Sequence, residues 1–482
     1  MLLQALKNEK FTENGALCYD STFNYLLDFF AMGGSCRNRS DEDIIELFMK
    51  AYNQDRIKAI QLLFYFRDVR GGQGERRLFR VILNHLASID NGIEKLIPII
   101  EEYGRYDDLY CLVGTRFESQ MFSYLHTKFL EDLESEYPSL LGKWLKSENT
   151  SSKESRKLGR LTRKAFNMSP KDYRKALSKL REKIDIVERK MSNNEWSEID
   201  YSKLPSRAGL LYSQAFMNND YSRYHEFMCP DIDCCVKLNA SALYPYEIVK
   251  DVPEYGSVDE LKRSVLNNYW ANIPDYLNGE SSNSLAVIDV SGSMTGTPME
   301  VAVSLGLYMA ERNTGEFHNH FITFSSLPKL IEIKDKWDFV DRVRHIKSSD
   351  WGYNTDIEKV FLLLLNKAKK FNLSQDDMPK LVYIISDMEF DVATAGSNSD
   401  TVFEGLAKVF KENGFELPHL VFWNVDSRQN NIPVIGVGHY SLVSGFSPVI
   451  FETVMKQLSA EEVMNEVLNK ERYMKLYELL SE

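Results

Sequence analysis

The sequence has few cysteines and no long hydrophobic segment, and each absence narrows the kind of protein it can be. Six cysteines in 482 residues are too few for a disulfide framework, so we expect a reducing compartment, with the cytoplasm as the default location. No run of about 18 uncharged apolar residues occurs, so no membrane-spanning helix is expected. The first ten residues, with Lys7, Glu9 and Lys10, are too short and too charged for a secretory signal.

Two common catalytic motifs are also missing. The chain contains no Gly-x4-Gly-Lys-Ser/Thr loop to cradle nucleotide phosphates. It contains no Gly-x-Ser-x-Gly turn to expose a nucleophilic serine. The sequence therefore gives no support for a P-loop nucleotide hydrolase or a serine hydrolase, and we expect a protein without enzymatic activity.

The composition is that of a globular protein with more than one domain. Hydrophobic residues make up 44% of the chain and aromatic residues 12%, enough for a sizeable core. A length of 482 residues exceeds what one core usually organises, so two or three domains are expected.

The charge is unevenly distributed. The net charge is -12, yet residues 143–190 hold sixteen Lys or Arg against six Asp or Glu. A basic block in an acidic protein can mark a nucleic-acid surface. The alternative interpretation is a solvated helical face or a domain linker, and charge alone favours this alternative.

Residues 1–275 are predicted to form successive amphipathic helices. Ser40 begins one helix as an N-cap, and Ser169 followed by Pro170 and Asp172 begins another. Apolar residues then recur at helical spacing, with breaks such as the glycines at 71–74. No fixed-period repeat is found, so an irregular helical array is expected, not a regular solenoid.

The pattern changes at about residue 283, where apolar strands alternate with helices until about 450. This alternation predicts an α/β domain with a parallel sheet covered on both faces, so the whole chain is expected to be multidomain, α followed by α/β. Residues 451–482 are expected to form a helical segment that packs on the rest. The predicted strands are Leu285–Asp289, Phe317–Phe324, Leu381–Ile385, Leu420–Asn424 and Pro433–Val437, and the predicted helices lie near 299–312, 356–371, 401–413 and 449–480.

The most informative motif is Asp289-Val-Ser291-Gly-Ser293, directly after a predicted buried strand. It places three small oxygen ligands on one turn, which hard divalent cations favour. Two further pieces follow: Thr355, within Gly-Tyr-Asn-Thr-Asp, and Asp387, at the end of another predicted strand. Because ligands of α/β sheets bind at the carboxyl ends of strands, Asp289 and Asp387 are expected to lie together.

These three pieces, in this order, resemble the metal-ion-dependent adhesion site (MIDAS) of von Willebrand factor A domains. The resemblance covers about residues 283–450 and implies a Rossmann-like fold. It implies that Ser291 and Ser293 bind the ion through hydroxyls, Thr355 directly or through water, and Asp289 and Asp387 directly or through coordinated waters. Mg²⁺ suits such a set of oxygens, and Mn²⁺ could replace it. In the alternative interpretation, Ser291 and Ser293 only cap the helix near Pro298. A phosphatase-like Asp-x-Asp would need a second carboxylate, which is missing.

Two glycine-rich motifs in the helical half carry arginines. In Arg70-Gly-Gly-Gln-Gly-Glu-Arg76, glycines that allow a close backbone approach lie between arginines that could contact phosphate. The second motif is Gly104-Arg-Tyr-Asp-Asp108. The alternative interpretation, slightly favoured, is that each is a tight turn held by internal Arg–Asp pairs.

Together with 196–205, 243–248 and 387–391, these motifs resemble an uncharacterised family found in plants, fungi, bacteria, phages and large DNA viruses. Its layout is similar to that of Ro ribonucleoproteins, or TROVE-domain proteins, which join a ring of HEAT-like helical repeats to a von Willebrand A domain and bind structured or misfolded RNA. This resemblance in layout implies a TROVE-like, HEAT-like array and a structured RNA as partner. The candidate phosphate contacts are Arg70, Arg76, Arg156, Lys157, Arg160, Arg163, Lys164, Arg174 and Lys175. The alternative function is a protein-interaction scaffold whose cation captures an acidic residue of a partner.

One further cluster could bind metal. His225, Cys229, Cys234 and Cys235 lie within eleven residues and are all possible zinc ligands. Their spacing is not one of the standard zinc arrangements, and adjacent cysteines rarely share one ion. Ordinary loop cysteines are therefore the favoured interpretation.

Overall fold

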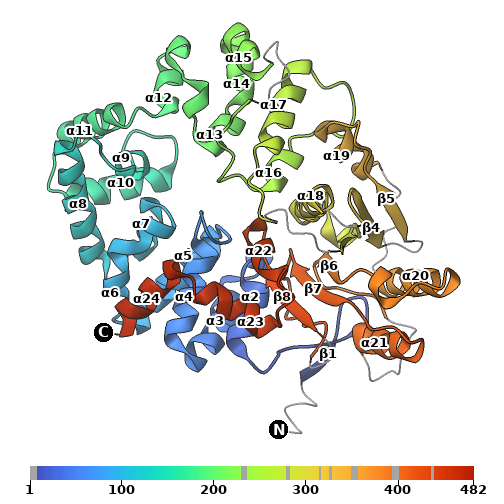
Figure 1. Ribbon diagram of the computed structural model, residues 1–482. Coiled ribbons are helices and arrows are strands. Elements are labelled where there is room, and N and C mark those ends of the chain that lie inside the picture. Colours follow the sequence, from blue (N-terminus) through green and yellow to red (C-terminus); the bar gives the residue numbers. More distant parts are fainter. Residues whose placement is uncertain are drawn as a thin grey trace.

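The structure is a computed structural model of the full chain (Figure 1). It describes residues 8–229, 236–277, 283–313, 316–324, 328–348, 356–392, 401–435 and 439–481. A helical N-terminal region is followed by a C-terminal region built on a six-stranded mixed sheet. The predicted class, α followed by α/β, is therefore confirmed at this level.

The N-terminal region begins with a short antiparallel hairpin, β1 (Glu9–Phe11) and β2 (Leu17–Tyr19), which the sequence pattern did not predict. An arc of helices follows it (Figure 1). The helices are α2 (Tyr25–Gly33), α3 (Asp41–Gln54), α4 (Arg56–Arg67), α5 (Arg76–Ile89), α6 (Ile93–Leu96), α7 (Ile100–Tyr103), α8 (Glu118–Glu134), α9 (Leu141–Trp144), α10 (Lys153–Ala165), α11 (Pro170–Lys183), α12 (Val187–Ser192), α13 (Ser206–Leu211), α14 (Ser213–Asn219), α15 (Tyr221–Met228), α16 (Pro245–Val249) and α17 (Glu260–Ala271).

Local sequence signals explain where several of these helices begin. The Ser40 hydroxyl accepts a hydrogen bond from the backbone N–H of Asp43, and the Ser169 hydroxyl accepts one from that of Asp172. Each bond satisfies one of the donors left free at a helix start. Both predicted N-caps are therefore confirmed. The apolar stripe of α11 is also buried, because Tyr173, Leu177 and Leu180 are each at most 3% exposed.

The sheet has the strand order β5-β4-β3-β6-β7-β8. All neighbouring pairs are parallel except β4 and β5, which are antiparallel. Strands β3, β6 and β7 are buried along their whole length, as their continuous apolar runs predicted. The strands are β3 (Ser284–Asp289), β4 (His320–Phe324), β5 (Lys329–Glu332), β6 (Leu381–Ser386), β7 (His419–Asn424) and β8 (Tyr440–Ser444).

Two strand predictions need correction. The last strand was predicted at Pro433–Val437, but residues 433–435 form no strand and β8 begins at Tyr440. The apolar core of β8 is short and centred on Leu442, so the prediction fell on the more apolar segment before it. The edge strand β5 was not predicted, because three of its four residues are exposed and it lacks an apolar run.

Helices cover the sheet and continue beyond it. The helices predicted near 299–312, 356–371 and 401–413 are confirmed, whereas α19 was not predicted and the expected helix 449–480 is divided into three. The helices are α18 (Thr297–Arg312), α19 (Phe339–Lys347), α20 (Ile357–Lys370), α21 (Val402–Glu412), α22 (Phe451–Val454), α23 (Ala460–Leu468) and α24 (Glu471–Ser481).

Both ends of the helical arc pack against the C-terminal region, so the molecule closes on itself (Figure 1). At the first end, α2 packs on β8 and α24 packs on α4. The hairpin adds backbone bonds, because the N–H of Tyr19 donates to the carbonyl of Ile432 at 2.9 Å and the reverse bond has the same length.

At the other end, α16 packs on α18 and α17 packs on α19. Trp270 stacks on Phe339 with ring centroids 4.5 Å apart, and its indole N–H donates to Glu311 at 2.7 Å. Arg263 forms an ion pair with Asp338 at 2.6 Å. Aromatic and charged contacts thus fix this junction.

The carboxylate of Asp68, at the end of α4, joins the C-terminal helix to the first helices. Asp68 is fully buried and pairs with Arg472, whose Nη2 donates to it at 2.9 Å. The hydroxyl of Tyr473 donates to the same carboxylate at 3.0 Å, and the backbone carbonyl of Tyr473 accepts from Gln61. One buried acid therefore holds two consecutive residues of α24.

We expect Asp68→Asn to destabilise the protein by about 3 kcal/mol, because it leaves Arg472 without its acid partner in a half-buried site. The measurement is the free energy of unfolding in urea. Glu466→Gln, which removes the exposed pair with Lys456, is the control and should cost less than about 1 kcal/mol. Equal losses for the two variants would contradict this role of Asp68.

Candidate cation site and basic surface

Asp289 is the last residue of β3 and is fully buried. One carboxylate oxygen accepts the backbone N–H of Ser291 at 2.9 Å, and the other accepts the hydroxyl of Ser386 at 2.6 Å. Because Ser386 ends the neighbouring parallel strand β6, these bonds tie the two strand ends together.

The hydroxyls of Ser291 and Ser293 face each other at 3.0 Å. Ser291 is 4% exposed, whereas Ser293 is exposed. Neither caps the next helix: the N-cap of α18 is Gly296, and no side chain accepts a bond there. The interpretation of the two serines as helix caps is therefore wrong.

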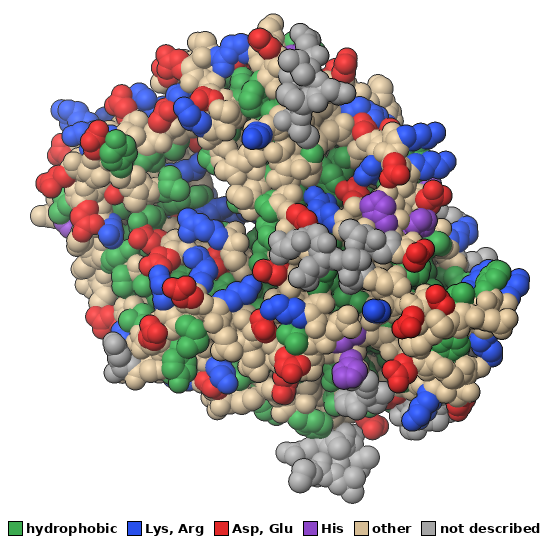
Figure 2. All heavy atoms as spheres, viewed as in Figure 1, with side chains coloured by type: hydrophobic (Ala, Val, Ile, Leu, Met, Phe, Trp, Pro, Cys, Tyr) green, Lys and Arg blue, Asp and Glu red, His purple; other side chains and the backbone are tan. Residues whose placement is uncertain are grey.

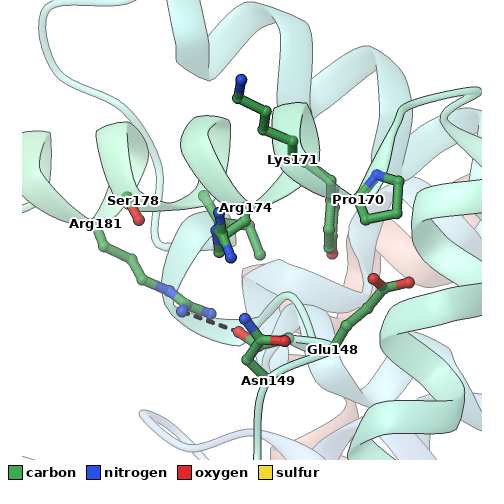
Figure 3. Close-up of a pocket in the computed structure, with 10 residues that line it drawn as sticks. Glu148, Asn149, Pro170, Lys171, Arg174, Ser178 and Arg181 are labelled. Carbon is green, nitrogen blue, oxygen red and sulfur yellow. Dashed lines mark hydrogen bonds between the residues drawn. The ribbon is translucent and has the colours of Figure 1, made fainter.

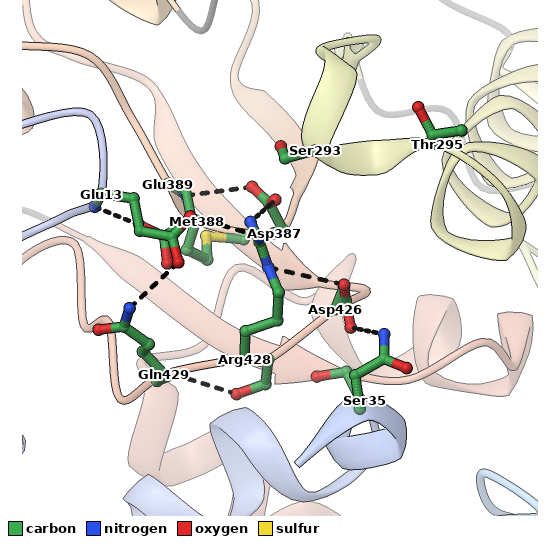
Figure 4. Close-up of polar contacts among 12 residues, drawn as sticks. Glu13, Ser35, Ser293, Thr295, Asp387, Met388, Glu389, Asp426, Arg428 and Gln429 are labelled. Atoms are coloured by element: carbon green, nitrogen blue, oxygen red, sulfur yellow. Dashed lines mark hydrogen bonds and ion pairs between the residues drawn. The ribbon is translucent and has the colours of Figure 1, made fainter.

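Asp387 follows β6 and carries the second carboxylate of the site. It is 2% exposed and forms an ion pair with Arg428, whose Nη2 lies 2.6 Å from its Oδ2. Figure 4 shows Arg428 between Asp387 and Asp426, with Ser293 on the other side of Asp387. Arg428 also pairs with Glu13 of the N-terminal hairpin at 3.3 Å. Sequence reasoning missed Arg428 because it lies in a loop with no motif around it.

Two carboxylates lie close together at this edge of the sheet, and this proximity affects the pKa of Asp289. Burial, and next the neighbouring carboxylate of Asp387, raise the pKa of Asp289 to about 7. A divalent cation between the two carboxylates would relieve both effects, so the donor set fits a hard ion. Thr355, the remaining predicted ligand, lies outside the described residues.

The described residues contain no group of three or more His, Cys, Asp or Glu that could hold a metal ion. A cation at Asp289 would therefore depend on hydroxyls and waters, as Mg²⁺ sites often do. Of the four possible zinc ligands, His225 and Cys229 lie at α15 and just after it, and His225 stacks on Tyr221. Cys234 and Cys235 lie outside the described residues.

The predicted phosphate contacts fall into two groups. Arg156 donates to the backbone carbonyls of Thr150 and Ser151, and Arg163 pairs with Glu148 at 2.8 Å, so both hold the fold together. The others on α10 and α11 are exposed, and among the described residues none has an anionic partner: Lys157, Arg160, Lys164, Arg174 and Lys175. Lys153, Lys171 and Lys179 are similar exposed cations that were not predicted from the sequence. The sequence does not distinguish them from paired lysines, because the difference lies in the exposure of each side chain.

A pocket of about 390 Å³ lies between α11 and the loop 147–149. Tyr173 and Leu177 form its buried floor, and Figure 3 shows Arg174 and Arg181 pointing toward Asn149. Arg181 is already bound to backbone carbonyls, which include that of Gly142 at 2.9 Å. Arg174 and Lys171 are thus the cations of this pocket that remain available to a ligand.

The two glycine–arginine motifs prove to be adjoining tight turns. Arg67 and Asp108 form a fully buried pair at 2.6 Å, and Arg80 binds Asp108 at 2.7 Å. A Cβ on Gly104 would lie 2.5 Å from Asp108, so only glycine fits there. Internal Arg–Asp pairs thus hold the second motif, Gly104–Asp108, whereas the arginines of the first motif form no such pair among the described residues. Arg70 donates to the carbonyl of Glu102 at 3.2 Å, whereas Arg76 remains exposed.

We expect Mg²⁺ to raise the melting temperature, with a gain in stability of about 2.7 kcal/mol when the ion is about a hundredfold above its dissociation constant. The gain should grow as the pH rises through about 7, because the proton on Asp289 must leave before the ion binds. Asp289→Ala should abolish it, and the control Asp376→Ala, at an exposed acid, should keep it. A wild-type protein with no cation-dependent shift would contradict the site.

Arg428 and a cation would compete for Asp387. Arg428→Met should therefore lower the Mg²⁺ concentration at half-maximal stabilisation several-fold, which corresponds to about 1 kcal/mol of binding free energy. Arg342→Met is the matched control, because it removes another Arg–Glu pair, 2.7 Å long, from the same region. Mg²⁺ titrations followed by thermal melting compare the three proteins. A weaker response in Arg428→Met would show that Arg428 supports the cation and does not compete with it.

Comparison with known proteins agrees with the two-part architecture. Residues 12–89 and 131–282 match a family model described as a domain of unknown function, DUF2828, and residues 283–478 match another, DUF7788. The change from one to the other falls where helices give way to the sheet. "Uncharacterized protein L728" of Acanthamoeba polyphaga mimivirus is 28% identical over 501 residues, which cover 95% of this chain and 86% of that protein. Within the described residues, no helix is long and apolar enough to cross a membrane.

Proposed function

We propose that the protein is a non-catalytic RNA-binding protein, in which a HEAT-like helical array holds structured RNA and a von Willebrand A domain holds Mg²⁺ or Mn²⁺. The layout that motivates this proposal is similar to that of Ro ribonucleoproteins: an arc of helices that closes on a sheet with Asp289, Ser291 and Ser293 at a strand end. No catalytic step is proposed. The hydroxyls of Ser291 and Ser293 bond to each other, so among the described residues neither hydroxyl is paired with a general base.

The observation that carries the proposal is a row of cations along α10. Lys153, Lys157, Arg160 and Lys164 are exposed and follow one another at spacings of four, three and four residues, which places them on one face of the helix. Among the described residues none of the four has an acidic partner. Unpaired cations in a row can neutralise successive phosphates, with release of counterions. Exposed Lys171, Arg174, Lys175 and Lys179 extend the positive charge onto α11.

The second candidate function is a scaffold in which the cation captures an acidic residue of a partner protein. The exposure of Ser293 favours it, because a ligand could reach an ion at that hydroxyl from solvent. The two functions use different surfaces, so one molecule could perform both.

We expect the triple variant Lys157→Glu, Arg160→Glu, Lys164→Glu to bind structured RNA at least about 100-fold more weakly. The slope of log affinity against log salt should fall by about three, one for each lost phosphate contact. Arg163 is left unchanged because it pairs with Glu148. The measurement is RNA binding by fluorescence anisotropy over a range of salt concentrations.

The control for this experiment is Lys367→Glu, Lys370→Glu, Lys411→Glu, which makes the same change in net charge at exposed positions of α20 and α21. It should bind RNA like the wild type. If both variants lose affinity equally, net charge alone governs binding. If neither does, α10 is not the RNA surface.

A further inference from the structure

The two glycine–arginine motifs meet a third segment of the chain at one place. Gly74, with φ of +65°, packs so closely that a Cβ would lie 2.0 Å from the hydroxyl of Tyr244. Arg207 lies over the ring of the same tyrosine, 5.3 Å from its centroid, and pairs with Glu247 at 3.0 Å. Segments near residues 74, 105, 207 and 244 are thereby gathered in one part of the helical region.

Positive charge exceeds negative charge at this meeting point. Two buried carboxylates, Asp107 and Asp108, are shared by three cations, Arg67, Arg80 and Lys146. Each of these two acids is therefore paired with at least two cations, although one oxygen of Asp107, Oδ1, has no hydrogen-bond partner among the described residues.

Arg105 and Arg76 are the arginines left over. Within the described part of the chain, neither guanidinium has a carboxylate partner. Arg105 instead lies over the ring of Trp144, with its Cζ 4.4 Å from the centroid. Burial, followed by the charges of Arg76 and Arg67, lowers the pKa of Arg105 to about 10. Burial and the charge of Arg80 also lower the pKa of Arg76. Arg105 is half-buried and Arg76 is exposed, and two cations that repel one another are in an environment that an anion would stabilise.

A cavity of about 840 Å³ opens beside Arg105. The molecular surface is hollowed between α9 and α13, where the cavity lies (Figure 2). Arg105 and Arg207 line it together with the apolar side chains of Leu140, Trp144 and Leu211. Leu140 is 56% exposed and Leu211 is 71% exposed, so two leucines of the lining remain largely open to solvent.

Most acids in the cavity wall are already neutralised. Glu188 pairs with Lys143 at 2.9 Å, and Asp185 pairs with Lys190 at 2.8 Å. Asp200 pairs with Lys203 at 3.0 Å, and Glu198 contributes one more carboxylate. The cavity therefore presents apolar side chains beside Arg105, the one lining cation with no acidic partner among the described residues. This arrangement suits a ligand with one anionic end and one flat, weakly polar body.

We propose that this cavity binds a nucleotide, whose phosphate is held by Arg105 and Arg207 and whose base packs against the apolar side chains of Leu140 and Leu211. An arginine fork matches two phosphate oxygens at once. The volume is sufficient for one nucleotide. The site shares no residue with the row of cations on α10, so it stands whether or not α10 binds RNA. The nucleotide is either free or one unit of an RNA strand.

The test uses the full chain and isothermal titration calorimetry with uridine 5′-monophosphate. Wild type should bind it saturably and more tightly than inorganic phosphate, and uridine should not bind measurably. Arg105→Gln should weaken binding at least about tenfold, the usual loss for one charge-assisted bond. Arg116→Gln, at an exposed arginine with no acid partner among the described residues, is the matched control and should bind like the wild type.

A second measurement separates ligand binding from folding. Because like charges surround Arg105, Arg105→Gln should keep or raise the melting temperature without ligand, whereas loss of a structural residue would lower it. Competition by a short oligouridylate would show that the nucleotide can belong to a strand, and binding of the monophosphate alone would identify a free nucleotide. The α10 triple variant should still bind uridine 5′-monophosphate. Absence of saturable binding in wild type, or equal binding by Arg105→Gln, would overturn the proposal.

Discussion

The guanidinium of Arg428 joins the two parts of the molecule at the candidate cation site. It pairs with Asp387 at the end of a central strand, with Glu13 of the N-terminal hairpin and, at 3.8 Å, with Asp426. This arginine supplies positive charge to the buried carboxylate of Asp387, which lies beside that of Asp289 at one sheet edge. The charge state of the sheet edge and the position of the hairpin therefore depend on the same side chain.

The contacts around Arg428 extend this connection. Arg39 donates to the backbone carbonyls of Ser427 and Gln429, and Asn38 donates to Asp426 at 2.9 Å. The loop that carries Arg428 is thus held mainly by residues from the first forty positions of the chain. A change in charge at the cation site should therefore act first on this junction, because the loop that carries Arg428 contacts both the carboxylates and the helical region.

The sequence predicted the parts of the fold that depend on continuous patterns. The fully buried strand at 284–289 and the serine caps at Ser40 and Ser169 lie where expected. The hairpin and the edge strand β5 were missed, because three or four half-exposed residues leave no periodic signal. The last strand was misplaced, because β8 has only a short apolar core around Leu442.

The site was predictable only where it was local. Asp289, Ser291 and Ser293 form one turn, and the parallel strands bring the carboxyl end of β6 beside them. Arg428 could not be predicted, because it reaches Asp387 from a loop whose path the sequence pattern does not indicate. The basic block shows the same limit. The number of charges can be read from the sequence, whereas only the structure shows that Arg163 is paired and Lys157 is exposed.

Closure of the helical arc has a consequence for how the molecule comes apart. An open stack of helices frays from its tips, since a terminal helix has a neighbour on one side only. Here the outermost helices on both sides are docked, α2 and α4 at one junction and α16 and α17 at the other. Loss of order must then start by undoing a junction, so the array and the sheet should melt as one cooperative unit. A protease cut within the arc would leave both fragments attached to the same sheet.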